Sequence, residues 1–110
     1  MTVAELSKQT GFALVCGDGS REAQGVYCGD LLSIVMGRAP ADCAWVTMLG
    51  NINSVAVAVL ADVACIVVAE NMPLDADAQA RAEGMEIPVL RTPLPVFEAA
   101  VALAKALNLL

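Results

Sequence analysis

The chain has 110 residues, of which 58% are hydrophobic, 16% charged and 4% aromatic, and its formal net charge is −6. A chain of this length fits one domain, residues 1–110, whose core needs no disulfide, metal or cofactor. Its six Lys and Arg residues form no run. The surface therefore lacks the positive charge that nucleic acids and anionic membranes require, and we exclude both as partners.

The amino-terminal residues and the longest apolar segment argue against export and membrane insertion. The start of the chain has no basic residues followed by an apolar stretch, so it does not match a secretory signal. Residues 55–69 are shorter than the roughly 20 residues of a membrane-spanning helix, and Asp62 interrupts them. We expect a cytoplasmic protein.

The cysteines predict neither a metal centre nor a disulfide framework. Cys16, Cys28, Cys43 and Cys65 lie far apart, and the chain contains no His. Zinc and iron-sulfur sites use clustered Cys, or Cys with His at short spacing. We expect these four residues to be small buried hydrophobes.

The residues that usually carry catalysis are missing. Without His, the commonest general base is absent, and no G-x-S-x-G nucleophile elbow occurs. The glycine-rich loop at residues 17–21 lacks the lysine and the spacing of a phosphate-binding P-loop, which favours a simple turn. The sequence therefore predicts a protein that is not an enzyme.

The apolar pattern predicts alternating strands and helices. Thr2 and Glu5 have the spacing of a capping box, and Asp30 is the expected N-cap of the second helix. Residues 54–62 alternate Val with Ala as a strand would, but their Ala content and polar start favour a helix. In chain order we expect a helix at 2–9, strands at 12–16 and 25–28, a helix at 31–36, a strand at 43–49, a helix at 54–62, a strand at 64–69, a helix at 75–84, a strand at 88–91 and a helix at 95–110.

This alternation predicts an α/β fold, a largely parallel sheet of about five strands with helices on both faces. Ligands of such sheets bind beyond the carboxyl ends of the strands, near a topological switch point. Asn51 and Asn53 can cap a helix or bind a ligand, and Arg91 can meet an anion or form a surface salt bridge. The expected ligand-binding residues are Gly29, Asp30, Thr47, Asn51, Asn53 and Arg91.

Several tracts together resemble the DRTGG domain family. The G-D-L-L-S and I-P-V-L-R-T tracts are the most specific, whereas the D-R-T-G-G string itself does not occur. The similarity extends over nearly the whole chain. Its tracts run from Val26 to Ser33 with Val35 and Met36, from Ala44 to Thr47, from Asn51 to Ala58, and from Ile87 to Thr92 before Phe97 and Glu98.

The resemblance implies a fold like the N-terminal domain of HPr kinase/phosphorylase, which associates with copies of itself. Members that lie beside CBS domains in pyrophosphatases imply a regulatory role near adenine-nucleotide sites. Stand-alone members imply a link to iron hydrogenase and electron-transfer proteins. The kinase chemistry of the larger enzyme belongs to a separate P-loop domain.

Three functions remain open, and we favour a non-catalytic regulatory or interaction domain. The second is a small-molecule binder, for an adenine nucleotide, and the third is a minimal enzyme or a redox thiol protein. We also expect a homodimer with an interface of apolar helix surface. The helix at residues 55–61 has no polar side chain, and residues 96–107 contain only Glu98 and Lys105 as charges.

Overall fold

The structure, a computed structural model, describes all 110 residues as alternating helices and strands. The predicted succession is confirmed, including the helix at residues 54–62 that also fitted a strand. No helix combines the length and the hydrophobicity that a bilayer crossing requires. The elements are α1 (Val3–Thr10), β1 (Ala13–Cys16), β2 (Gly25–Cys28), α2 (Leu32–Arg38), β3 (Cys43–Thr47), α3 (Ile52–Ala61), β4 (Cys65–Val68), α4 (Ala76–Gly84), β5 (Val89–Arg91) and α5 (Val96–Ala106).

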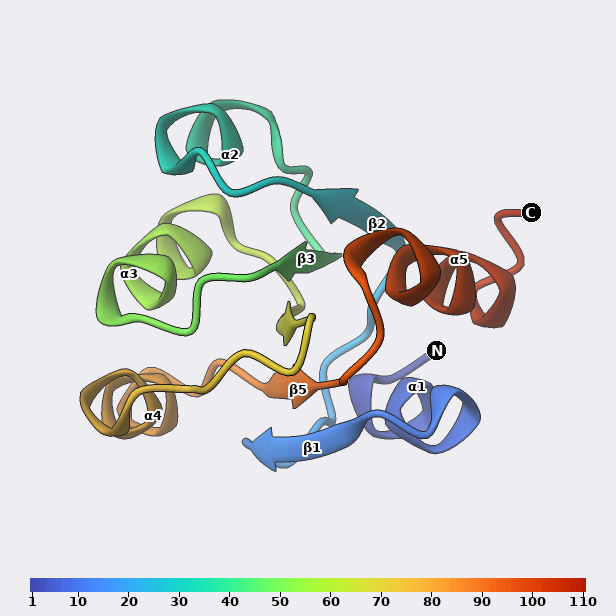
Figure 1. Cartoon of the computed structure of the whole chain (residues 1–110), viewed down its shortest axis with the longest axis horizontal. Coiled ribbons are helices and arrows are strands. Elements are labelled where there is room, and N and C mark those ends of the chain that lie inside the picture. Colours follow the sequence, from blue (N-terminus) through green and yellow to red (C-terminus); the bar gives the residue numbers. More distant parts are fainter.

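The strands form one sheet in the order β1-β5-β4-β3-β2. Strands β2 to β5 are parallel, and β1 runs antiparallel to β5 at one edge. Helices α2, α3 and α4 cover one face of the sheet, whereas α1 and α5 cover the other (Figure 1). The expected largely parallel sheet with helices on both faces is therefore confirmed.

A hydrophobic core lies on each face of the sheet. Trp45 and Ile66 point toward α2, α3 and α4, while the neighbouring Val46 and Val67 point toward α1 and α5. Strands β3 and β4 are buried along their whole length, as their continuous apolar runs predict. Burying each such side chain fully stabilises the fold by about 1.5–3 kcal/mol.

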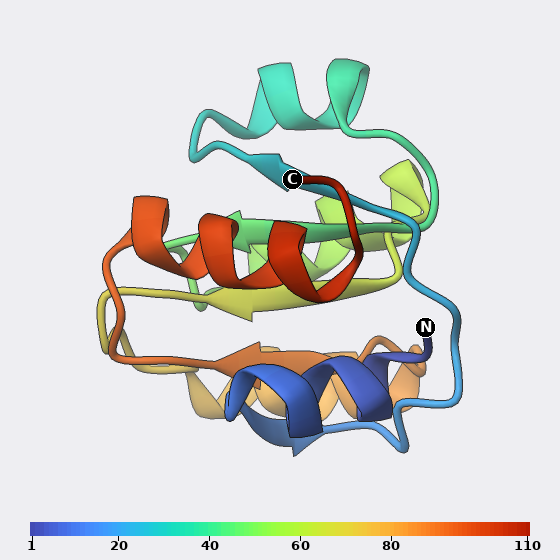
Figure 2. The same ribbon diagram turned by 90° about the vertical axis from the view of Figure 1, so that its right-hand side faces the viewer.

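The connections between the strands determine where a ligand crevice can lie. Helices α2, α3 and α4 follow β2, β3 and β4 on one face, and the chain then crosses to the other face after β5 to form α5. The chain thus leaves β4 and β5 toward opposite faces, which makes this pair the topological switch point. Figure 2 shows the carboxyl ends of the parallel strands at its left side.

The start of α1 is capped as the sequence predicts. The Glu5 N–H donates to Thr2 Oγ1 at 3.1 Å, and the Thr2 N–H donates to Glu5 Oε1 at 3.0 Å, so both halves of the capping box are present. Gly11 ends the helix with a φ of 76°, in the left-handed region that glycine adopts without strain.

Candidate functional site

Asp30 and Thr47 meet at the ends of β2 and β3. The Thr47 hydroxyl donates a hydrogen bond of 2.5 Å to Asp30 Oδ1, and the Met48 N–H donates to the same oxygen at 2.9 Å. Thr47 is fully buried and Asp30 is exposed. The prediction of Asp30 as a helix N-cap was wrong, because its carboxylate points to the loop after β3 and Leu31 precedes α2 with no side-chain cap.

Gly29, which precedes Asp30, and the two asparagines at the start of α3 have separate roles. The Gly29 carbonyl accepts a hydrogen bond of 2.9 Å from the Trp45 indole N–H. Asn51 is the N-cap of α3, and its Oδ1 accepts from the Ser54 N–H at 3.0 Å. Asn53, in the first turn of α3, is exposed and makes no side-chain hydrogen bond within the chain. Of these residues, Asn53 is free to contact a ligand.

Arg91 occupies the same edge of the sheet at a distance from the other candidates. Thr47 pairs with Val68, which pairs with Arg91, so two strand spacings of about 10 Å separate Thr47 from Arg91. The Arg91 guanidinium donates to the Met72 carbonyl at 2.6 and 3.0 Å, and to the Asn71 carbonyl at 3.3 Å. Arg91 forms no surface salt bridge. Its hydrogen bonds instead stabilise the loop that follows β4.

The switch point between β4 and β5 is closed by hydrogen bonds. The Glu70 N–H donates to the Leu94 carbonyl at 2.8 Å, and the Asn71 N–H donates to the Thr92 carbonyl at 3.1 Å. Glu70 Oε2 also accepts from the Val96 N–H at 3.0 Å and so caps α5. Sequence reasoning missed Glu70, although a carboxylate directly after a buried strand is a signal that could have identified it.

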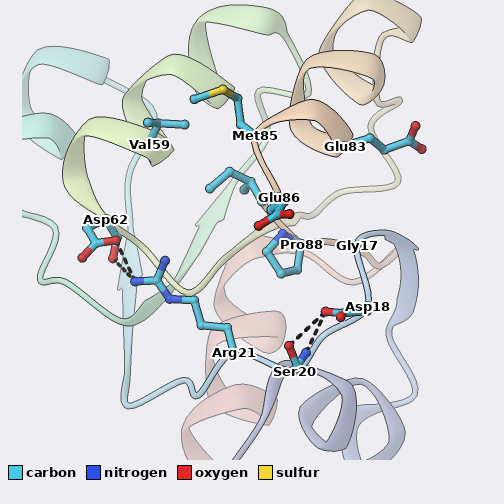
Figure 3. Close-up of a pocket in the computed structure, with 11 residues that line it drawn as sticks. Gly17, Asp18, Ser20, Arg21, Val59, Asp62, Glu83, Met85, Glu86 and Pro88 are labelled. Carbon is cyan, nitrogen blue, oxygen red and sulfur yellow. Dashed lines mark hydrogen bonds and ion pairs between the residues drawn. The ribbon is translucent and has the colours of Figure 1, made fainter.

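A cavity of about 620 Å³ lies at the opposite edge, near the amino ends of the parallel strands. Residues 17–21, the end of α3 and the turn between α4 and β5 form its walls (Figure 3). Sequence reasoning did not predict this cavity, because its walls come from three distant segments. It is lined by Gly17, Asp18, Ser20, Arg21, Val59, Asp62, Glu83, Met85, Glu86, Ile87 and Pro88.

The charges around this cavity are mostly negative. Arg21 Nη2 donates to Asp42 Oδ1 and to Asp62 Oδ1, each at 2.9 Å, so two carboxylates already neutralise the guanidinium. Asp18, Glu83 and Glu86 add three further carboxylates. Phosphate groups would therefore meet repulsion here, and the cavity does not suit a nucleotide.

The glycine-rich loop at residues 17–21 holds α1 in place. Its Gly19 and Arg21 carbonyls accept hydrogen bonds from the Ala4 and Val3 N–H groups, both at 2.9 Å. A phosphate-binding loop presents N–H groups to its ligand, whereas this loop presents carbonyl oxygens to a helix N-terminus. The structure thus supports the interpretation of this segment as a turn.

The cysteines are poor nucleophiles. Burial raises the pKa of Cys43 to about 11 and that of Cys65 to about 12, and burial also raises the pKa of Cys16. Cys28 is exposed, so the expectation that all four cysteines are buried was wrong. Desolvation by neighbouring atoms and the charge of Asp30 nevertheless raise the pKa of Cys28 as well. Reactive cysteines have lowered pKa values, which these residues lack.

Comparison with known proteins adds a likeness at the level of the fold. The chain is similar to the CBS and DRTGG domains of the regulatory region of a pyrophosphatase from Clostridium perfringens, solved in complex with its activator diadenosine tetraphosphate. The TM-score is 0.75, and the alignment covers 96% of this chain and 46% of the other, at 11% sequence identity. The fold is DRTGG-like.

The likeness has defined limits. At 11% identity it concerns the fold, and the DRTGG-like chain spans less than half the length of the structure that it matches. No protein-family model and no curated protein matches the sequence. The narrower likeness to the N-terminal domain of HPr kinase/phosphorylase stays a prediction.

Proposed function

We propose that this chain is a non-catalytic regulatory or interaction domain. The observation that carries this proposal is its similarity, over 96% of its length, to part of a region that regulates a pyrophosphatase. The chemistry of the chain agrees with that role. Every buried polar side-chain atom has a hydrogen-bond partner, and the thiols have raised pKa values, so neither a strained polar group nor a thiolate is poised for reaction.

An assay of regulation tests this proposal. The chain is added to candidate partner enzymes encoded by the flanking genes, and their activity is measured with and without it. A change in partner activity is expected, with no turnover by the chain alone. Turnover by the isolated chain would contradict the proposal. The link to iron hydrogenase proteins has no support in the fold, so it enters this assay as one candidate among others.

Binding of an adenine nucleotide is the second candidate function. Its support is the diadenosine tetraphosphate bound to the similar regulatory region. The exposed Asn53 amide, in the first turn of α3, offers the donor and acceptor pair that an adenine edge requires. Acidic residues at the same edge oppose the phosphates. The proposed contact is therefore with the base, and the predicted residues stay Gly29, Asp30, Thr47, Asn51, Asn53 and Arg91.

Thermal melting separates the two candidates. A nucleotide at 100 times its dissociation constant stabilises the fold by about 2.7 kcal/mol, which raises the melting temperature of a domain this size by roughly 10 °C or more. Diadenosine tetraphosphate and ATP are the probes, and Asn53→Ala is the test variant. A shift that the variant reduces supports nucleotide binding. An unchanged melting temperature up to millimolar nucleotide contradicts it and leaves the interaction function.

We also propose a homodimer, a single domain over residues 1–110 and a cytoplasmic location. Apolar helix surface supports the dimer: Leu60 in α3 is 71% exposed, and Ala56 lies exposed on the same helix. A two-fold dimer would cover such surface. Light scattering should give twice the mass of 11.3 kDa, and Leu60→Ser should weaken the dimer. A mass of one chain at all concentrations would contradict the dimer.

A further inference from the structure

Exposed apolar side chains gather at the carboxyl edge of the sheet. Each of the four parallel strands is followed by a loop or a first helical turn that exposes at least one large apolar residue, and two of these residues, Leu31 and Phe97, are 66% and 75% exposed. The remaining members include two methionines, whose flexible side chains suit adaptable contacts. We call this surface the edge patch, and it consists of Leu31, Met48, Ile52, Met72, Leu94 and Phe97.

The loops that carry the edge patch are bonded to one another in series. The Met48 N–H donates to Asp30 Oδ1 at 2.9 Å, which joins the loops after β2 and β3. The Asp75 N–H donates to the Gly50 carbonyl at 2.8 Å, which joins the loops after β3 and β4. The Glu70 N–H donates to the Leu94 carbonyl at 2.8 Å, which joins the loops after β4 and β5. These bonds hold the loops in fixed relative positions, so the edge patch is preorganised, which lowers the entropy cost of binding.

The same segments contain acidic side chains and no basic ones. Two arginines from neighbouring segments lie close by: the Arg91 guanidinium donates to the Met72 and Asn71 carbonyls, and Arg81 lines a hollow with Ile52 and Asp77. The loops and first helical turns after the four strands cover residues 29–35, 48–55, 69–79 and 92–99 and contain no Lys or Arg. All their acidic side chains are exposed. The five carboxylates of these segments outnumber the two arginines, so a partner that covers the edge patch has to supply positive charge. The acidic residues are Asp30, Glu70, Asp75, Asp77 and Glu98.

We infer that the edge patch binds a basic, amphipathic segment of a partner protein. Apolar side chains of that segment would contact Leu31, Met48 and Phe97 and their neighbours, while its Lys and Arg residues would pair with the surrounding carboxylates. The four strand ends span about 14 Å, which about ten helical residues cover at 1.5 Å per residue. A second copy of this chain fits less well, because it would place five carboxylates against five carboxylates.

Fluorescence anisotropy with two labelled probe peptides tests this inference, which rests on the proposed interaction function. One is an 18-residue amphipathic helix of Leu and Lys, and the other has Glu in place of Lys. The full chain should bind the Lys peptide and should bind the Glu peptide at least about tenfold more weakly. Leu31→Ser with Phe97→Ser should weaken Lys-peptide binding about tenfold. The matched control, Leu109→Ser with Leu110→Ser, removes two leucines outside the edge patch that are 51% and 77% exposed, and it should leave binding within about twofold.

Three results of the binding measurements would overturn the inference. These are no binding of the Lys peptide, equal binding of the two peptides, and equal losses in the edge and control variants. A halved mass of the Leu31→Ser, Phe97→Ser variant in light scattering would identify a second copy as the occupant and would also overturn it. Failure here leaves the partner-enzyme assay and the nucleotide melting experiment unaffected, so it can be told apart from failure of the proposed function.

Discussion

The hydroxyl of Thr47 donates a hydrogen bond of 2.5 Å to the carboxylate of Asp30, and this bond joins the ends of two neighbouring parallel strands. Thr47 Oγ1 also accepts from the Leu49 N–H at 3.1 Å. Thr47→Val keeps the shape of the side chain but removes both bonds, and we expect it to lower the free energy of unfolding by about 1–3 kcal/mol. Urea unfolding measures this loss. Thr47→Ser retains the hydroxyl and should lose less, and equal losses would contradict a role for the hydroxyl.

The two asparagines at the start of α3 should differ in their effect on stability. Asn51→Ala removes the helix cap and should lower the free energy of unfolding by about 1 kcal/mol. Asn53→Ala removes an exposed side chain that has no hydrogen-bond partner in the chain. It should change the free energy of unfolding by less than about 0.5 kcal/mol. Thermal or urea unfolding compares the two variants. An equal loss in both would show that Asn53 also stabilises the helix start.

Substitution by alanine should destabilise the chain at Gly50 and stabilise it at Gly37. A Cβ on Gly50 would lie 2.1 Å from the Pro73 carbonyl oxygen, so Gly50→Ala must displace backbone and should cost about 2 kcal/mol or more. Gly37 lies in α2 with open space around it, and Gly37→Ala should stabilise the chain by about 0.5–1 kcal/mol because alanine favours helix. Urea unfolding of both variants measures whether the free energy of unfolding falls in Gly50→Ala and rises in Gly37→Ala. An undiminished stability of Gly50→Ala would contradict the close packing of these loops.

One thiol of the native chain should react with a mild alkylating agent at neutral pH. Cys28 is exposed, and the other three cysteines are buried. Because the pKa of Cys28 is raised, it should react more slowly than free cysteine at the same pH. Mass spectrometry should find one adduct before unfolding and four after it, and none on native Cys28→Ser. Rapid addition of two or more adducts would favour the redox hypothesis.

Stability should fall at alkaline pH. The pKa values of Cys43 and Cys65 are raised from 9.0 to about 11 and about 12. Above pH 9 the unfolded chain loses these thiol protons while the folded chain keeps them, so the stabilisation is complete below pH 9 and is lost as pH rises through the folded values. Each thiol should contribute a slope of up to about 1.4 kcal/mol per pH unit. Replacing both cysteines by Ala should reduce the slope of the free energy of unfolding against pH. An unchanged slope would show that other groups cause the loss of stability.

Local patterns identified most of the fold. The capping box of Thr2 and Glu5 depends on neighbours in the sequence, so it could be predicted, and the helix at residues 54–62 follows from its Ala content and the Asn51 cap. The antiparallel placement of β1 could not be predicted, because it depends on pairing between Ala13 and Arg91, which are far apart in the chain.

The candidate site was harder to predict than the fold, because its geometry depends on contacts between distant loops. Asp30 has the residue type of a helix cap, but its partners are Thr47 and Met48 on the next strand. Arg91 ends a strand as expected, yet the carbonyls of the loop after β4 already occupy its guanidinium. The sequence indicated the edge of the sheet on which these residues lie, but it did not indicate their hydrogen-bond partners.

The pairing of β1 with β5 has a consequence for synthesis of the chain. Strands β2, β3 and β4 each pair with the next strand to be made, so that part of the sheet can assemble as the ribosome releases it. Strand β1 is made before the other four strands, but its partner β5 ends only at Arg91. The segment from α1 to β1 therefore cannot complete its packing, and Leu6 and Phe12 lack their core, until the chain has been made beyond Arg91.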